Sequence, residues 1–288
     1  MCGALVAGIL TGASGAASPQ TPVAQASAHA AESARSLPYC FGTVLWTSRG
    51  TLHARSWRVT KKRKWRPQYV HASRAKLGFA PHAYMLNGEG GGRGMWFNDY
   101  IAISKRRAVY SFTAVQYKSK KTITIRDKRR IGRLKGKAKP MTSMFDAYFV
   151  KKNGRVTYAP NAEKPNKRVR VRGLRLRNFR FGGVAFASTK KLGVVNVMFA
   201  VQGKRLVRVV LKGRKVVRAP RVVARGWGSA KGLTTRVCPS ASRLSVVRIG
   251  KNRKARGFVQ RRILAKRPPK LGKGRALAGV YRGRGFGV

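Results

Sequence analysis

Acidic residues are scarce in this chain. Its 288 residues include 65 Lys and Arg but only 6 Asp and Glu, which gives a formal net charge of +59. So few carboxylates leave most of the cations without an internal partner, and a field of one sign attracts anions while it opposes compaction. We therefore expect anionic partners from outside the chain and a folding equilibrium that depends on salt.

Long apolar runs are also missing. The stretch from Gly3 to Ser18 is shorter than the roughly 20 residues that a membrane-spanning helix needs. It resembles the apolar core of a secretory signal, and cleavage-type triplets follow at Ala24–Ala26 and Ala28–Ala30, although no Lys or Arg precedes the run. These features predict a leader over residues 1–35 and a secreted or cell-envelope protein. An Ala-rich disordered arm is the alternative.

Cysteine is rare, with Cys2, Cys40 and Cys238 as the three examples. Cys2 would leave with the leader, so the remaining two predict a disulfide between Cys40 and Cys238 and an oxidising compartment. Two buried free thiols are the alternative. Because no CxxC motif or Cys/His ligand spacing is present, we predict no metal site and no cofactor.

Catalytic signatures are absent as well. The chain has no HExxH or GxSxG motif, and its few carboxylates show no spacing typical of a paired acid and base. An enzyme would need its scattered acids and histidines, such as His53, Asp99 and Asp146, to converge in one pocket. The sequence therefore favours a non-catalytic protein, with an enzyme on an all-β scaffold as an alternative.

Strand patterns dominate what is present. Hydrophobic residues make up 43% of the chain, enough for a core. Short β-rich runs alternate with turns in 42–59, 96–127 and 193–223, and no comparable window shows helical periodicity. The pattern predicts an all-β meander of short antiparallel strands. It is most typical of a β-propeller with five or six blades, while a sandwich or a partly open barrel is the alternative.

Local signals predict the turns and the domain limits. Asn153 and Gly154 are expected to form a type I′ hairpin turn between two strands. Two segments rich in Lys, Arg and Gly, 128–139 and 266–288, are expected to be poorly ordered. The prediction is thus a single domain over residues 36–265, followed by a basic flexible tail over residues 266–288.

The candidate anion-binding site is a segment of alternating arginines, 168–177. Val169, Val171, Leu174 and Leu176 are predicted to face the core, with arginines on the opposite face. Guanidinium groups match phosphate and sulfate oxygens, although an ordinary solvated strand face would show the same pattern. The predicted ladder consists of Arg168, Arg170, Arg172, Arg175 and Arg177.

Three weaker signals accompany the ladder. The segment 87–94 (NGEGGGRG) is predicted to be a flexible surface loop, and it lacks the spacing of phosphate-binding loops. The RGRGFG segment of the tail resembles arms that bind single-stranded nucleic acid. The five tryptophans are expected mainly in the core, with stacking on bases or sugars as the alternative. They are Trp46, Trp57, Trp65, Trp96 and Trp227.

Taken together, these features predict a secreted, strongly basic, non-catalytic protein that binds anionic polymers. Its expected partners are cell-envelope polymers or extracellular nucleic acid, held through charge. The alternative is an intracellular protein that contacts nucleic-acid phosphates without reading the base sequence.

Overall fold

A computed structural model describes residues 40–60, 64–92, 94–117, 119–141, 143–238, 242–281 and 283–287. These residues form strands and no helix, so the all-β prediction is confirmed. None of the described segments provides a helix able to span a membrane. The leader predicted over residues 1–35 lies outside the described residues.

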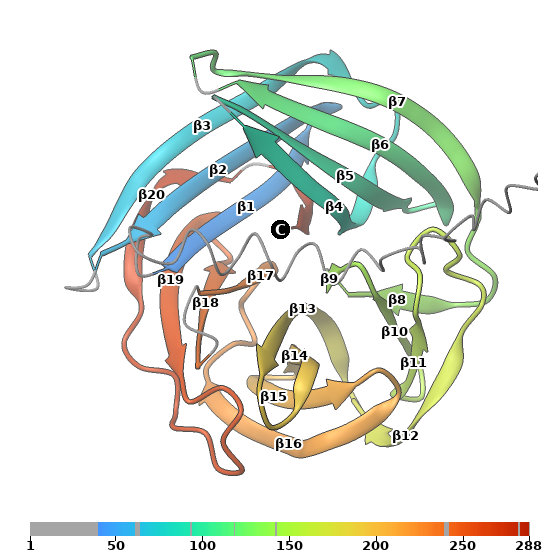
Figure 1. Ribbon diagram of the computed structural model, residues 1–288, viewed down its shortest axis with the longest axis vertical. Helices are drawn as coiled ribbons and strands as arrows, with labels where there is room; N and C mark the ends of the chain where they lie inside the picture. Colours follow the sequence, from blue (N-terminus) through green and yellow to red (C-terminus); the bar gives the residue numbers. More distant parts are fainter. Residues whose placement is uncertain are drawn as a thin grey trace, which may run out of the picture. The chain divides into compact units, whose positions relative to one another are not determined.

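The strands group into five antiparallel units of four, which we call blades 1 to 5 in chain order (Figure 1). Blade 1 contains β1 (Cys40–Ser48), β2 (Thr51–Val59), β3 (Trp65–Lys76) and β21 (Arg284–Gly287). Blade 2 contains β4 (Pro81–Gly92), β5 (Met95–Ser104), β6 (Ala108–Tyr117) and β7 (Thr122–Arg133).

The later blades follow the same meander. Blade 3 contains β8 (Ala138–Pro140), β10 (Ala147–Lys151), β11 (Arg155–Ala159) and β12 (Val169–Arg175). Blade 4 contains β13 (Phe179–Thr189), β14 (Gly193–Gln202), β15 (Arg205–Lys212) and β16 (Lys215–Arg225). Blade 5 contains β17 (Gly232–Val237), β18 (Arg243–Ile249), β19 (Lys254–Arg261) and β20 (Arg275–Val280).

Two short pairings join neighbouring blades. The outer strands β3 and β7 pair in parallel at Ala72–Thr122 and Ser73–Ile123, so blades 1 and 2 share one hydrogen-bonded sheet. The two-residue strand β9 (Ser143–Met144) pairs in parallel with β4. The inner strands of four blades meet with β9 in a ring, in which β21 touches β4, β4 touches β9, β9 touches β13, β13 touches β17 and β17 touches β21. Four-stranded sheets around a common centre are a β-propeller-like architecture.

Burial on both faces explains why β14, an interior strand of blade 4, is almost continuously apolar. On β14, Val195, Val197 and Phe199 pack in the cluster that includes Leu233 of blade 5. The alternate residues Met198 and Ala200 pack instead against blade 3. Successive side chains point to opposite faces of a strand, so a strand between two blades needs apolar residues at every position. The core therefore consists of layers between the blades.

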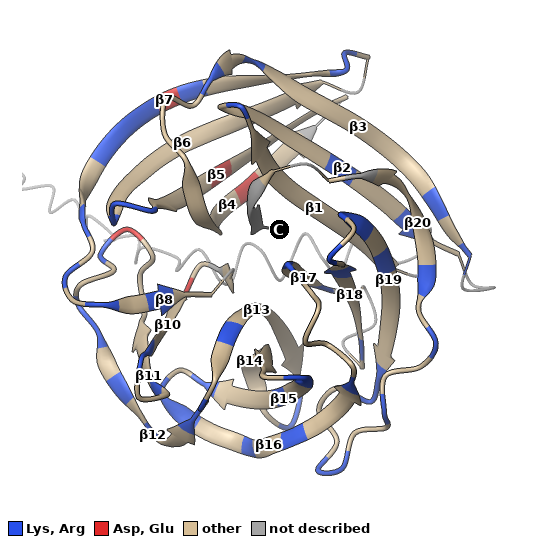
Figure 2. Ribbon diagram, turned by 180° about the vertical axis from the view of Figure 1, so that it is seen from behind, with Lys and Arg blue, Asp and Glu red and all other residues tan. Residues whose placement is uncertain are grey.

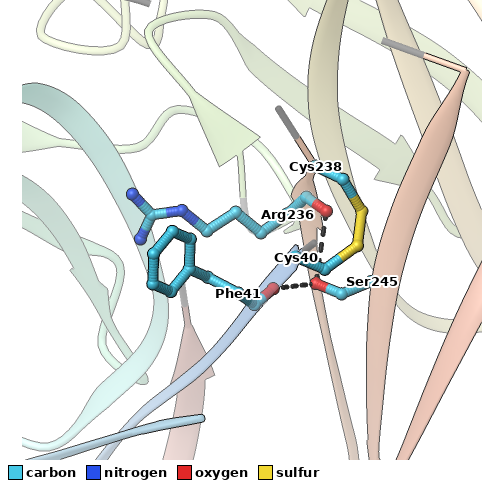
Figure 3. Close-up of a disulfide and its surroundings, with 5 residues drawn as sticks. All are labelled: Cys40, Phe41, Arg236, Cys238 and Ser245. Atoms are coloured by element: carbon cyan, nitrogen blue, oxygen red, sulfur yellow. Dashed lines mark hydrogen bonds between the residues drawn. A yellow bond between two sulfur atoms is a disulfide. The ribbon is translucent and has the colours of Figure 1, made fainter. Parts of the chain in front are cut away.

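The first and last blades are joined at one seam (Figure 3). Cys40 and Cys238 form a disulfide with a Cα–Cα distance of 4.5 Å across 198 residues of sequence. The Ser245 hydroxyl donates to the Phe41 carbonyl. The Thr234 hydroxyl of β17 donates to the Thr43 carbonyl at 2.7 Å. C-terminal β21 also pairs with β1, so blade 1 is built from both ends of the described chain.

The predicted hairpin at Asn153 and Gly154 is present, but its turn type differs from the prediction. β10 and β11 pair from Ala147–Ala159 to Val150–Val156, which leaves a three-residue loop rather than a two-residue one. Gly154 has a φ of +80° and Asn153 has none in the positive region. Gly154 N donates to Lys151 O at 2.9 Å, as in a type I turn that ends in a left-handed glycine.

Three segments expected to be irregular contain strands instead. β7 continues to Arg133, and β8 begins at Ala138, within the segment 128–139. The 87–94 segment lies mostly in the β4–β5 hairpin. Residues 266–288, predicted as a flexible tail, contribute β20 and β21. In each case pairing with another strand supplies the order that the local composition lacks.

Candidate anion-binding surfaces

Cations concentrate on the outer strands of the blades. β7 carries Arg126, Lys128, Arg129, Arg130 and Arg133, all exposed, and β16 carries Lys215, Arg218, Arg221 and Arg225. The inner strand β4 has no Lys or Arg at all, and β13 and β17 have one each. Figure 2 shows the basic residues along β3, β7, β12 and β16 and at the turns. The basic charge therefore lies mainly at the periphery of the sheets.

The arginine ladder lies on the outer strand of blade 3. Val171 and Leu174 of β12 and the following Leu176 are buried, as predicted, but Val169 is 41% exposed, which corrects the predicted core face. Gly173 has a φ of +70°, and the pairing of β12 with β11 shifts register, so strict alternation stops inside the strand. The exposed members are Arg170, Arg172, Arg175 and Arg177.

Arg168 differs from the other four arginines. Its Nη2 donates to the Lys135 carbonyl at 2.6 Å, and its guanidinium lies 4.9 Å from the centre of the Phe149 ring. Burial lowers the pKa of Arg168. Because backbone and ring contacts hold this side chain, the exposed ladder has four arginines. Arg168 instead links blade 3 to the segment that precedes it, through the Lys135 carbonyl.

The described carboxylates do not neutralise the outer strands. The described residues contain one ion pair, in which Arg236 Nη2 lies 3.1 Å from Glu89 Oε2, between the inner strands β17 and β4. Asp99 accepts from the Thr113 hydroxyl at 2.6 Å, and Glu163 accepts from the Asn87 amide at 3.2 Å. Asp99 and Glu163 thus engage neutral donors and Glu89 engages one inner arginine, while Asp127 lies exposed among the cations of β7.

The residues considered for an enzymatic centre do not converge. His53 stacks on Trp46 in blade 1, with ring centres 5.0 Å apart, whereas Asp99 belongs to blade 2. Asp146 accepts from the Asn196 amide at 2.9 Å, between blades 3 and 4, and burial raises its pKa. Among the described residues, no group of three or more His, Cys, Asp or Glu side chains is arranged to hold a metal ion.

The tryptophans divide between core and surface. Trp57 and Trp227 are buried at 1% and 2% exposure, and Trp46 is buried at 7%. Trp65 packs partly buried against blade 5 residues, while Trp96, near the tip of the β4–β5 hairpin, is 41% exposed. Stacking on a ligand ring therefore remains available to Trp96.

Sequence reasoning missed a pocket beside blades 1 and 2. It has a volume of about 520 Å³ and includes two cations, Arg49 and Lys76, but no acidic residue in its lining. Arg49 lies in the β1–β2 turn with a φ of +49°, and Phe79 stacks on Tyr110 with ring centres 3.9 Å apart. The remaining lining residues are Thr47, Ser48, Gly50, Gly78, Phe79, Ala80, Pro81 and Gly283. No local motif signals this pocket, because a turn, a linker and the C-terminal segment build it together.

Comparisons with known proteins concern the fold alone. No protein-family model matches the chain. No curated protein sequence matches it either. The crystal structure of AofleA from Arthrobotrys oligospora is similar, with a TM-score of 0.50, 7% identity and coverage of 84% of each chain.

Two further solved structures are more distantly similar. A glucose dehydrogenase has a TM-score of 0.39 and 9% identity, over 73% of this chain and 93% of that one. The WD40 domain of SCAP from fission yeast has a TM-score of 0.28 and 10% identity, over 77% of this chain and 52% of that one. At such identities no site residue can be transferred to this chain.

Proposed function

We propose that this protein is a secreted, non-catalytic binding protein for anionic polymers, and that the outer strands of its blades form the binding surface. The observation that carries the proposal is the set of exposed cations on β7, β12 and β16, with no carboxylate at ion-pair distance among the described residues. Such a surface raises the local concentration of polyanions and accelerates their encounter.

The ladder of Arg170, Arg172, Arg175 and Arg177 forms the blade 3 part of this proposed surface. A guanidinium offers several donors in a planar fork, which suits the oxygens of phosphate and sulfate groups. Because the ladder lies on an outer strand, an extended polymer would meet it without entering a cleft. Contacts to charged groups along a polymer fix position but read no base sequence.

Export is proposed on two supports. The Ala-rich segment of residues 1–35 resembles a leader, and disulfides persist in oxidising compartments. The Cys40–Cys238 pair of the structure fits such a compartment. Intact mass and thiol titration of protein from its native host test this part: a trimmed, disulfide-bonded chain supports export, and a full-length, reduced chain favours the intracellular nucleic-acid-binding alternative.

Binding itself is tested with two probes, dextran sulfate and a random-sequence DNA duplex. A protein that neutralises about 6 to 10 phosphates loses roughly 10³ to 10⁵ in affinity for DNA between 50 and 200 mM salt. We expect both probes to bind with steep salt dependence and the duplex to bind without sequence preference. Affinity that does not change with salt would rule the proposal out.

A further inference from the structure

Arg208 is a fully buried cation with incomplete hydrogen bonding. It lies on β15, an interior strand of blade 4, and its side chain has 0% exposure. Nη2 donates to the Ala265 carbonyl at 2.6 Å, but the buried Nε and Nη1 atoms have no hydrogen-bond partner. A buried charged group is normally paired and fully hydrogen-bonded, because its desolvation is otherwise unfavourable by several kcal/mol.

Two further arginines increase the positive charge at this place. Arg221 lies opposite Arg208 in the β15–β16 pairing. Arg218 Nε donates to the Leu264 carbonyl at 3.2 Å. Burial, followed by repulsion from Arg218 and Arg221, lowers the pKa of Arg208 to about 10. Within the described residues no carboxylate forms an ion pair with any of the three.

A basic segment contacts Arg208 and Arg218, whereas Arg221 is exposed. Residues 263–271, which we call the strap, belong to the connection from β19 to β20 (Figure 1). Ile263 is buried, and its N–H donates to the Ser242 carbonyl at 3.2 Å, while the Leu271 N–H donates to the Val223 carbonyl of β16 at 2.7 Å. Between these two anchors the strap exposes Lys266, Arg267 and Lys270.

Three arginines of blade 4 and three exposed cations of the strap therefore lie on adjoining segments, which backbone carbonyls and apolar anchors hold together. Repulsion among them opposes closure of the strap. A compact anion would remove the repulsion and would supply acceptors for the unpaired nitrogens of Arg208. Phosphate and sulfate match guanidinium donors in both geometry and charge.

We propose that Arg208, Arg218 and Arg221 form a site for a compact oxyanion, inorganic phosphate or sulfate, beneath the strap of residues 263–271. Nε and Nη1 of Arg208 have no contact with solvent in this structure, so the strap lifts between Ile263 and Leu271 to admit the ion. The ion then replaces the Leu264 and Ala265 carbonyls as the acceptor of the arginine donors. This site adjoins the proposed polymer-binding surface at β16, which carries Arg218 and Arg221, and differs from it in Arg208, which is fully buried.

The test compares thermal unfolding in sodium phosphate and in sodium chloride at equal ionic strength. A ligand that binds only the folded state raises its stability in proportion to the logarithm of ligand concentration above the Kd. We expect the Tm of the wild type to rise by several degrees in phosphate relative to chloride. In Arg208→Met we expect this phosphate-specific rise to disappear, whereas the matched variant Arg172→Met on exposed β12 retains it.

The Tm of Arg208→Met in chloride distinguishes an anion-binding role of Arg208 from a purely structural one. Replacement of a buried charge by a side chain of similar volume is often neutral or stabilising, so its Tm in chloride should equal or exceed that of the wild type. A large loss of Tm in chloride, or an equal phosphate-specific rise in the wild type and in Arg208→Met, would overturn the proposal.

Amide hydrogen exchange of the wild-type protein gives a readout that does not depend on any variant. Phosphate should slow exchange in the strap, at residues 263–271, more than in the remaining β19–β20 connection, and chloride at equal ionic strength should not. Exchange in the strap that is the same in both salts contradicts the proposal. Binding of dextran sulfate should be the same for the wild type and Arg208→Met, so failure of the oxyanion site and failure of polymer binding remain distinguishable.

Discussion

The inner strand β4 and the outer strand β7 belong to the same blade and have the same length, 12 residues, yet they differ sharply in charge. β4 has no Lys or Arg, whereas β7 has five. β4 lies in the ring of inner strands, between β21 and β9, while β7 forms the outer part of the blade. In blade 2 the cations therefore lie on the outer strand and away from the ring.

Two physical effects favour this arrangement. A cation on an inner strand would lose its hydration and would lie near cations of the neighbouring blades, whereas an outer cation keeps its water and is screened by salt. Lysine and arginine stems can also cover apolar sheet edges while the charged ends stay in water. The same arrangement leaves the outer cations accessible to anions.

A cation introduced on an inner strand should have the largest effect. Ala185 on β13 has 0% exposure, so Ala185→Arg buries a charge without a partner and overpacks the core. We expect a loss in the free energy of unfolding on the order of 5 kcal/mol, or failure to fold, measured by urea denaturation. Arg172→Ala on outer β12 is the control and should change stability by less than about 0.5 kcal/mol. Equal effects of the two changes would remove the distinction between inner and outer strands.

The seam beside the ring offers the next test. Replacement of Cys40 and Cys238 by alanine opens a closure of 198 residues, and loss of a native disulfide typically lowers the free energy of unfolding by about 2 to 5 kcal/mol. Thermal unfolding with and without reductant measures the same quantity in the wild type. The double-alanine protein should not respond to reductant. An unchanged Tm in the wild type after complete reduction would show that other contacts keep blades 1 and 5 together.

Salt should raise stability because it screens repulsion among the outer cations. We expect the Tm of the wild type to increase by a few degrees as sodium chloride rises from about 20 to about 500 mM, since the Debye length falls from tens of Å to a few Å over a comparable range. Neutralisation of the four exposed ladder arginines by glutamine should reduce the increase. A Tm that falls with added salt would mean that attraction, not repulsion, dominates between the described charges.

The smallest expected effect concerns pH. Burial lowers the pKa of His53, which is half-buried against Trp46. As pH falls through about 6.5, the unfolded chain takes up a proton that the folded chain still resists, so the free energy of unfolding decreases. His53→Phe should make the decrease between about pH 7.5 and 5.5 shallower without abolishing it, because burial and the cations Lys139 and Lys105 also lower the pKa of His82. An identical pH profile for wild type and variant would contradict the assignment.

Much of the fold could be predicted from local patterns. The alternating runs and turn residues of 193–223 correspond to β14, β15 and β16, where Gly203 and Gly213 take positive φ values at the turns. The strands of the C-terminal segment could not be found this way. β21 is a strand because β1 pairs with it, and that pairing joins opposite ends of the described chain.

The candidate sites show the same division. The alternation around residues 168–177 predicted an exposed arginine face, but only the structure shows that Arg168 is held by Lys135 and Phe149 while the other four arginines are exposed. Arg208 sits in the ordinary β pattern RLVRVVLK, with nothing to mark it as buried. Its burial depends on a strap that follows 57 residues later at Ala265, so pattern analysis of single strands could not detect it.

The most direct test of the central claim compares two variants with the same net charge. One replaces the ladder, Arg170, Arg172, Arg175 and Arg177, by glutamine; the other replaces four exposed turn cations, Lys105, Arg106, Lys190 and Lys191, by glutamine. The slope of log affinity for a DNA duplex against log salt is the measured quantity, and it changes by about 0.9 for each phosphate that the protein no longer neutralises. If the outer strands bind the polymer, the slope of the ladder variant is shallower by roughly 3 to 4, and the slope of the turn variant changes clearly less. Equal changes of slope in the two variants would show that net charge alone, and not the outer strands, determines binding.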